Sequence, residues 1–203
     1  MSQPVQRRFV SRAGLKLDQA LDAFGLDVAG WVCADFGCNV GGFTDCLLQR
    51  GAGKVYAIDT GYGALAWKLR KDSRVVVMER TNALYAQPAE PVDLAVIDMA
   101  WTIQELSIPA ALRWLRVAGG YNSWVISLLK PHYELAKLEG LAPRGILGLD
   151  RSREVCQCVC QRLADGGVTV AAVVESGLTG KGGNREFFLL VPGRPGETGQ
   201  VVD

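Results

Sequence analysis

Residues 31–59 have the sequence WVCADFGCNVGGFTDCLLQRGAGKVYAID and predict a strand, a glycine-rich loop, a helix and a second strand. The apolar run at each end of this stretch is typical of a short strand that is covered on both faces. The helix between them is expected to end at Gly51, because glycine commonly terminates helices. Each strand leads into an aspartate, Asp35 or Asp59, so acidic side chains are expected at one edge of a parallel sheet.

The same alternation of strand and helix continues along the chain. We expect strands at 31–34, 54–58, 74–78, 92–97, 123–129, 168–174 and 186–191. We expect helices at 11–24, 43–50, 65–71, 103–117 and 149–164. Pro109 predicts a late start or a break in the fourth of these helices. The pattern predicts an α/β fold with a doubly wound, mostly parallel sheet, in which a final hairpin produces one antiparallel edge strand.

The length and composition of the chain are typical of one folded domain, and its net charge does not indicate a particular kind of partner. The 203 residues are 49% hydrophobic and 21% charged, which is typical of globular proteins, and the net charge is only +1. No apolar stretch approaches the ~20 residues that cross a membrane, and no secretory leader is visible, so we expect a cytoplasmic protein with no membrane association. We divide the chain into a basic extension (1–10), a main domain (11–192) and a C-terminal tail (193–203).

The cysteines do not predict a metal site. Cys156, Cys158 and Cys160 are spaced by two, unlike the Cys-x-x-Cys pairs of zinc sites, and no histidine lies near them. On a helix, Cys156 and Cys160 would share a face and Cys158 would not. We interpret the six cysteines as free, small and mostly buried residues, and we expect no bound metal.

The loop Asp35-x-Gly37-x-x-x-Gly41-Gly42 has the position of a nucleotide-binding loop but not a standard spacing. It differs from the Gly-x-Gly-x-x-Gly of dinucleotide binders and from the phosphate loop. S-adenosylmethionine (SAM) carries no phosphate, so its loop need only pass beneath an amino acid and a ribose. Asp59, 24 positions after Asp35, could accept both hydrogen bonds of a ribose diol. The glycines alone are also compatible with a purely structural turn.

Four short motifs carry a lysine, an aspartate, a lysine and a glutamate in a fixed order. They are Ser11–Leu17, Val96–Ala100, Ser127–Pro131 and Asn184–Phe188. Together with the glycine loop, these motifs resemble those of the FtsJ-type RNA ribose 2′-O-methyltransferases. Over roughly residues 11–191, the sequence is most similar to the TlyA (hemolysin A-like) branch of that family. The resemblance implies a Rossmann-like, SAM-dependent RNA methyltransferase. It implies ribosomal or ribosome-bound RNA as partner and S-adenosylhomocysteine as product.

The resemblance also assigns site residues. It implies a catalytic tetrad of Lys16, Asp98, Lys130 and Glu186. We expect Lys130 to orient and deprotonate the ribose hydroxyl, since lysine can act as a base when it is partly buried or faces another cation. The implied SAM-binding residues are Asp35, Gly37, Cys38, Asn39, Gly41, Gly42, Phe43, Asp59, Thr81, Asn82 and Asp98. The expected RNA-binding residues are Arg7, Arg8, Arg12 and Trp101.

Two features depart from the TlyA pattern. Residues 99–102 read Met-Ala-Trp-Thr, where that branch usually has Ser-Phe-Ile-Ser, so the accepted nucleotide stays open. Only ten residues precede Ser11, where TlyA proteins usually carry an S4-like RNA-binding domain, so we expect weak binding to naked RNA. The alternatives are an NAD(P)-binding oxidoreductase, which the loop spacing disfavours, and a catalytically weak RNA-binding protein on the same fold. The sequence makes no prediction about the oligomeric state.

Overall fold

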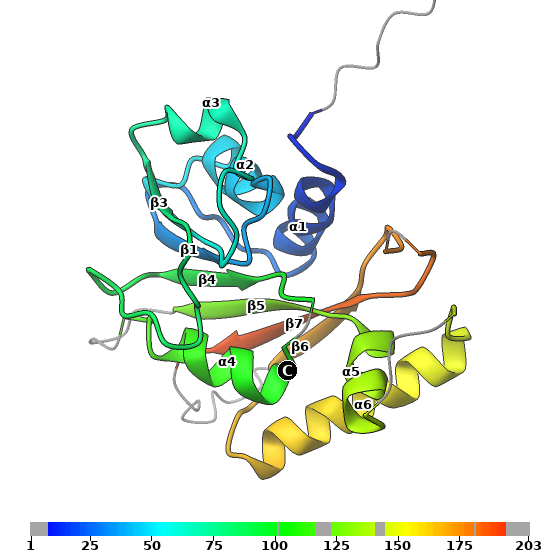
Figure 1. Cartoon of the computed structure of the whole chain (residues 1–203). Helices are drawn as coiled ribbons and strands as arrows, with labels where there is room; N and C mark the ends of the chain where they lie inside the picture. Colours follow the sequence, from blue (N-terminus) through cyan, green and yellow to red (C-terminus); the bar gives the residue numbers. More distant parts are fainter. Residues whose placement is uncertain (1–7, 101, 117–122, 141–144, 181, 194–203) are drawn as a thin grey trace, which may run out of the picture.

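The computed structural model describes residues 8–100, 102–116, 123–140, 145–180 and 182–193 (Figure 1). A seven-stranded sheet has the order β3-β2-β1-β4-β5-β7-β6. Its strands are β1 Val32–Phe36, β2 Lys54–Ile58, β3 Val75–Met78, β4 Leu94–Ile97, β5 Trp124–Leu129, β6 Ala172–Glu175 and β7 Phe187–Pro192. The helices are α1 Arg12–Ala23, α2 Gly42–Gln49, α3 Trp67–Arg70, α4 Gln104–Leu112, α5 Pro131–Leu138 and α6 Leu149–Asp165.

The predicted mostly parallel sheet with antiparallel pairing at one edge is confirmed. Strands β3, β2, β1, β4 and β5 are parallel neighbours, and β7 is antiparallel to both β5 and β6. The reversed strand β7 therefore lies second from the edge, and β6 forms the edge itself. Since the carboxyl ends of the parallel strands meet at one side of the sheet, this topology places Asp35, Asp59, Asp98 and Lys130 along the same edge.

Helices cover both faces of the sheet. Figure 1 shows α1, α2 and α3 on one side and α4, α5 and α6 on the other. Alternate residues of β1 follow this division, because Cys33 packs with the α1–α2 layer and Ala34 with the α4–α6 layer. Apolar residues dominate both core clusters, which explains why the parallel strands read as continuous hydrophobic runs. In the part of the chain that the structure describes, no helix is long and apolar enough to cross a membrane.

Two helices differ from the sequence expectations. The prediction that Pro109 delays or breaks its helix is wrong, because α4 begins at Gln104 and runs through the proline, which forgoes only one backbone hydrogen bond. The helix α5 was not predicted at all. Pro131 occupies its first turn, where a missing N–H costs nothing, so Lys130 directly follows the strand β5 and is also the N-cap of a helix.

Candidate active site

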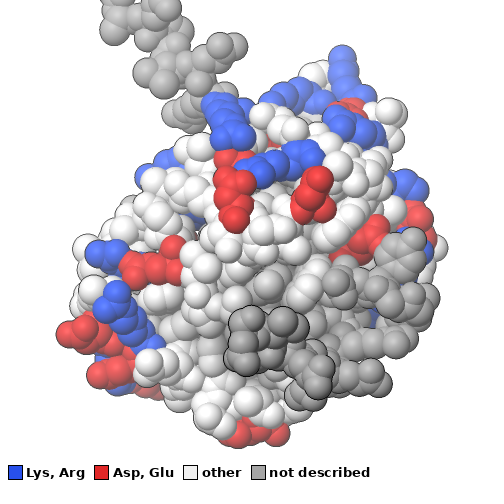
Figure 2. Space-filling model, turned by 180° about the vertical axis from the view of Figure 1, so that it is seen from behind, with Lys and Arg blue, Asp and Glu red and all other residues white. Residues whose placement is uncertain are grey.

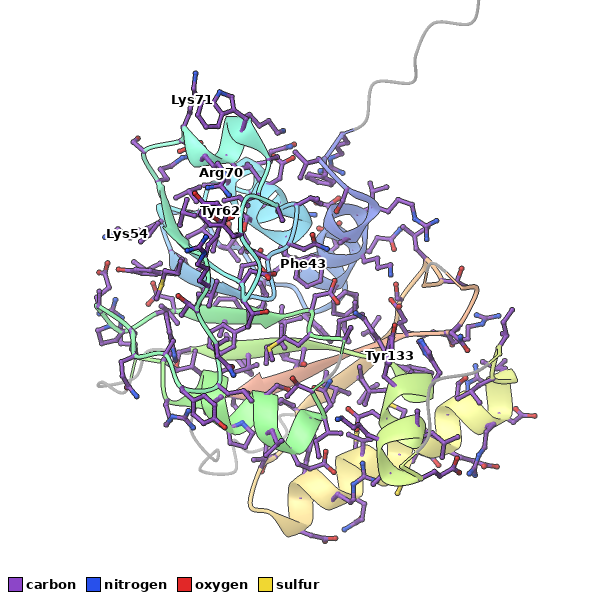
Figure 3. The ribbon with its side chains drawn as sticks, viewed as in Figure 1. Phe43, Lys54, Tyr62, Arg70, Lys71 and Tyr133 are labelled. Atoms are coloured by element: carbon purple, nitrogen blue, oxygen red, sulfur yellow. The ribbon has the colours of Figure 1, made fainter. Side chains whose placement is uncertain are left out.

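A cleft of about 770 Å³ opens at the carboxyl edge of the sheet. Its walls come from the ends of β1, β2, β3, β4 and β5 and from the start of α1, which supplies Ser11 and Ala13. The predicted cofactor residues that line it are Asp35, Gly37, Cys38, Asn39, Gly42, Phe43, Asp59, Thr81, Asn82 and Asp98. Figure 3 places Phe43 beside this edge, in the first turn of α2. Ten of the eleven residues that the sequence predicted to bind the cofactor therefore line this cleft.

The loop glycines are required by close approaches. A Cβ on Gly37 would lie 2.8 Å from the carbonyl oxygen of Asp98. A Cβ on Gly42 would lie 2.2 Å from Ser11 Oγ, so the start of α1 can close over the loop only because this residue is glycine. Gly41 is not among the cleft-lining residues: with φ of +94° it turns the backbone into α2, and a Cβ there would lie 2.3 Å from Leu69 Cδ1.

Asp35 is fully buried at the end of β1 and carries an unused oxygen. Its Oδ2 accepts hydrogen bonds from Thr44 N at 2.9 Å and Thr44 Oγ1 at 2.6 Å, which anchors the first turn of α2. Its Oδ1 has no hydrogen-bond partner among the described residues. Burial raises the pKa of Asp35 to about 7, with the negative charges of Asp98 and Asp59 adding to the rise against the Thr44 hydrogen bonds. A hydrogen-bond donor in the cleft would satisfy this group.

Asp59 and the segment after β3 form the next part of the wall. Asp59 Oδ2 accepts a hydrogen bond from Asn39 N at 2.9 Å, and Oδ1 accepts one from Gly61 N at 2.7 Å. These bonds fix the carboxylate while each oxygen keeps a further acceptor position. Thr81 N in turn donates to the Asp59 carbonyl at 3.0 Å, which holds the Thr81–Asn82 segment against the same wall.

The tetrad residues form two ion pairs. Lys130 Nζ donates to Asp98 Oδ1, and both residues line the cleft. Lys16 Nζ donates to Glu186 Oε2 at 2.5 Å, and this pair is buried, with side chains only 9% and 4% exposed. The two ion pairs are neighbours because Leu129 of β5 pairs with Phe187 of β7. Lys130 directly follows Leu129, and Glu186 directly precedes Phe187. The structure thus brings Asp98 and Lys130 into the cleft and sets Lys16 and Glu186 in the protein beside it.

Two of the predicted RNA-binding arginines, Arg8 and Arg12, have protein partners. Arg8 pairs with the buried Asp18 at 2.5 Å, although its own side chain is 55% exposed. Arg12 donates to the carbonyl oxygen of Thr179 at 2.8 Å. Arg7 and Trp101 lie outside the described residues. In the view of Figure 2, positive and negative side chains are intermixed, in keeping with the many ion pairs of this chain.

Sequence reasoning missed the apolar part of the cleft and one anchoring residue. Ala83, Leu84 and Met99 line the wall, but single apolar residues after strands carry no recognisable signal. Thr44 was missed as the partner of Asp35, although its place in the first turn of the helix after the loop could have indicated it. Among the described residues, no group of three or more histidine, cysteine or acidic side chains is arranged to hold a metal ion.

Comparison with known proteins gives a consistent result. The sequence model of the FtsJ-like methyltransferase family matches residues 9–191. The chain is 42% identical over 205 residues to YqxC of Bacillus subtilis, which is provisionally named an rRNA methyltransferase; the match covers 96% of this chain and 70% of YqxC. It is 41% identical over 189 residues to the 16S/23S rRNA (cytidine-2′-O)-methyltransferase TlyA of Mycobacterium tuberculosis, covering 91% of this chain and 68% of TlyA.

Solved structures agree with the sequence relatives. A protein of Lactococcus lactis, provisionally described as a hemolysin, superposes with a TM-score of 0.83 at 34% identity, and the match covers 93% of this chain and 90% of that one. A methyltransferase of Listeria monocytogenes, provisionally described as SAM-dependent, has a TM-score of 0.63 at only 13% identity, so it shares the fold alone.

Proposed function

This chain belongs to the FtsJ-like methyltransferase family and is an enzyme, and we propose that it methylates a ribose 2′-hydroxyl of ribosomal RNA with SAM as donor. The observation that carries the proposal is the Lys130–Asp98 ion pair at the wall of the glycine-lined cleft. The printed activity of TlyA supports the choice of ribosomal RNA and of the 2′-oxygen. Membership of a methyltransferase family leaves no support for the oxidoreductase alternative.

The residues that line the cleft match the chemistry of SAM. The unused Oδ1 of buried Asp35 can accept a hydrogen bond from the cofactor's amino group, and Asp59 can accept from the ribose diol. Ala83, Leu84 and Met99 offer an apolar surface for the adenine, with Thr81 and Asn82 beside them. Glycine at 37 and 42 lets Asp98 and Ser11, two residues of the cleft wall, pack directly against the loop, where any Cβ would clash with them. Bound there, SAM supplies a methyl group already activated by its sulfonium.

The residues of this chain would align and deprotonate the acceptor. In its neutral amine form, Lys130 Nζ would accept a hydrogen bond and then the proton of the ribose hydroxyl as the oxygen attacks, and Asp98 would accept a hydrogen bond from Nζ and hold it in place. Lys16, fixed by Glu186, would add positive charge next to the developing alkoxide. Alignment of oxygen and methyl group alone lowers such a barrier by several kcal/mol. The chemistry therefore needs position and charge, which these two ion pairs provide.

The function is tested by following methyl groups from labelled SAM into ribosomal RNA. We expect incorporation into ribosomal subunits or their RNA, with the label recovered as 2′-O-methylnucleoside after digestion. The Lys130→Ala variant, which lacks the proposed base, serves as the negative control. Label on a base rather than a ribose, or no incorporation by a folded protein that binds SAM, would overturn the proposal.

Asp59→Ala is expected to weaken SAM binding by about 1.5–3 kcal/mol, because a charged acceptor of the ribose hydrogen bonds is lost. Titration calorimetry with SAM and with S-adenosylhomocysteine measures the change. The matched control is Asp27→Ala, since Asp27 is exposed and also accepts a backbone hydrogen bond, from Ala29 N at 3.0 Å. Equal affinities for Asp59→Ala and wild type would remove Asp59 from the cofactor site.

Arg12→Ala is expected to weaken RNA binding and to reduce its salt dependence, leaving SAM affinity unchanged. Arg12 is exposed in the first turn of α1, next to Ser11 and Ala13 of the cleft wall, and its protein partner is a neutral carbonyl. Loss of one phosphate contact lowers the slope of log K against log salt by about 0.7–0.9. Arg116→Ala is the control, because Arg116 pairs with Asp93 at the amino edge of the sheet. Indistinguishable slopes for the two variants would contradict the assignment.

A further inference from the structure

Helix α4 begins without a capping side chain of its own. Its N-cap residue, Ile103, has no polar side-chain atom, so the backbone N–H of Gln104 in the first turn needs an acceptor from elsewhere. Glu134 of α5 supplies it, because its Oε1 accepts a hydrogen bond from Gln104 N at 3.0 Å. Both residues are only 3% exposed, so little water reaches this bond. A carboxylate from a neighbouring helix therefore caps α4.

The side chain of Gln104 extends the same connection to the sheet. Its Oε1 accepts a hydrogen bond from Ser127 Oγ at 2.5 Å, and Ser127 is fully buried in β5. Ser127 lies three residues before Lys130, which directly follows β5 and is the N-cap of α5. Gln104 is thus hydrogen-bonded to both α5 and β5, the two elements that flank Lys130.

These bonds close a ring around the Lys130–Asp98 ion pair. One side of the ring is the segment from Asp98 to Gln104, and the other is the turn from Lys130 to Glu134. The ion pair joins the two segments at the cleft, and the hydrogen bond between Glu134 and Gln104 joins their far ends. Glu134 N also donates to the Lys130 carbonyl oxygen at 3.2 Å, which fixes the turn itself.

Glu134 lies behind the SAM cleft rather than in it. Among the described residues that line this cleft, neither Gln104 nor Glu134 is present. Both line a small hollow next to it, which shares Met99, Thr102 and Lys130 with the cleft. Glu134 can therefore act on methyl transfer only through the residues that it holds.

Glu134 also faces a charge, that of Arg162 in α6. Arg162 Nη2 lies 3.6 Å from Glu134 Oε2, too far for a hydrogen bond, and this Oε2 has no hydrogen-bond partner among the described residues. Arg162 instead donates a hydrogen bond to Glu105 of α4. Burial and the negative charge of Glu105 raise the pKa of Glu134 to about 7, against the Gln104 hydrogen bond and the charge of Arg162. The geometry therefore favours the oxygen that accepts from Gln104, and this acceptor function does not require the charge.

We propose that Glu134 is a positioning residue for methyl transfer, which holds Lys130 and Asp98 in line with the acceptor hydroxyl by accepting the hydrogen bond of Gln104 N. The proposal rests on the function proposed above. Without this bond, the N-terminus of α4 and the segment after Asp98 lose their connection to α5, so the ion pair can shift. A displacement of about 1 Å at a reacting group can slow an enzyme by about 10²-fold.

Three substitutions separate the hydrogen bond from the charge. Glu134→Gln keeps an oxygen at the right reach but no charge, Glu134→Asp keeps the charge but is one methylene shorter, and Glu134→Ala removes both. We expect single-turnover rates within about threefold of wild type for the glutamine variant and at least about tenfold lower for the other two. SAM affinity, measured by calorimetry, should change by less than about twofold in all three, because the loss is confined to the transition state.

Asp93→Ala is the matched control for a general loss of stability. Asp93 also accepts a backbone N–H, from Val32 at 2.9 Å, and pairs with an arginine, Arg116, but it lies at the amino edge of the sheet. This variant should unfold at a lower urea concentration, while its folded form keeps wild-type turnover. The proposal is overturned by a glutamine variant as slow as the alanine variant, by a wild-type rate for Glu134→Ala, or by an equal loss of turnover in Asp93→Ala.

Hydrogen exchange followed by NMR tests the same bond without turnover. The Gln104 amide should exchange at least about tenfold faster in Glu134→Ala and Glu134→Asp than in wild type, and it should stay protected in Glu134→Gln. The amides of Met99 and Ala100 should follow the same order, because they belong to the segment that this bond holds. Unchanged exchange at Gln104 in Glu134→Ala would refute the positioning role. A folded wild type that transfers no methyl group would refute the proposed function instead, and the order of exchange would still decide whether Glu134 holds this segment.

Discussion

Lys130→Ala is expected to abolish methyl transfer while leaving SAM affinity nearly unchanged. Lys130 Nζ lies at the cleft wall in an ion pair with Asp98, whereas the groups that fit the cofactor's amino and ribose ends are Asp35 and Asp59. A positioned base contributes about 10²–10⁴-fold to a proton-transfer step. An interaction made mainly in the transition state lowers turnover and spares ground-state binding. Single-turnover rates with labelled SAM, set beside calorimetry, separate the two effects.

Two further variants sharpen this test. Lys130→Arg keeps the charge but replaces a compact amine by a planar group that stays protonated, so it should recover little activity. Lys54→Ala removes another ion-paired lysine, bound to Glu90, from the amino end of β2. Figure 3 shows Lys54 on the opposite side of the molecule from Tyr133, which lies in α5, three residues after Lys130. Lys54→Ala should retain wild-type turnover. A wild-type rate for Lys130→Ala would refute the catalytic assignment.

The sequence predicted the elements of the fold whose own residues carry strong signals, such as apolar runs and helix-ending glycines. The β1–α2–β2 unit combines two apolar runs, a glycine loop and a stop at Gly51, and all of these agree with the structure. Helix α5 gave a conflicting signal, because Lys130-Pro131 looks like a strand terminated by a turn, and only the surrounding packing continues it as a helix. The position of β7 between β5 and β6 was equally hidden, since strand order is a property of long-range pairing.

The site follows the same division between local and long-range information. The cleft residues at the ends of strands were predictable, because parallel strands place their carboxyl ends together. Which lysine pairs with which carboxylate was not predictable, because Lys16 and Glu186 are 170 positions apart and meet only in the folded chain. Helix α6 shows the same limit: the spacing predicted that Cys156 and Cys160 share one face, but it could not predict that Val173 of the edge strand β6 lines the same surface hollow as these cysteines.

Glu186→Ala is expected to destabilise the protein by about 3–5 kcal/mol, because it leaves the Lys16 ammonium buried without its counter-charge. The Lys16 side chain is only 9% exposed, so water cannot replace the carboxylate without local rearrangement. Equilibrium unfolding in urea measures the loss as a lower midpoint at unchanged slope. Glu154→Ala is the control, since its pair with Arg151 is exposed and should contribute no more than about 1 kcal/mol.

The double variant Lys16→Met with Glu186→Met separates stability from chemistry. Removing both charges together abolishes the buried unpaired ion, and flexible methionine side chains can fill the space, so the free energy of unfolding should return close to that of wild type. Turnover should not return, because the positive charge proposed to face the developing alkoxide is gone. A double variant that is stable and fully active would show that the pair only supports the fold. A Glu186→Ala protein as stable as wild type would contradict the burial on which this prediction depends.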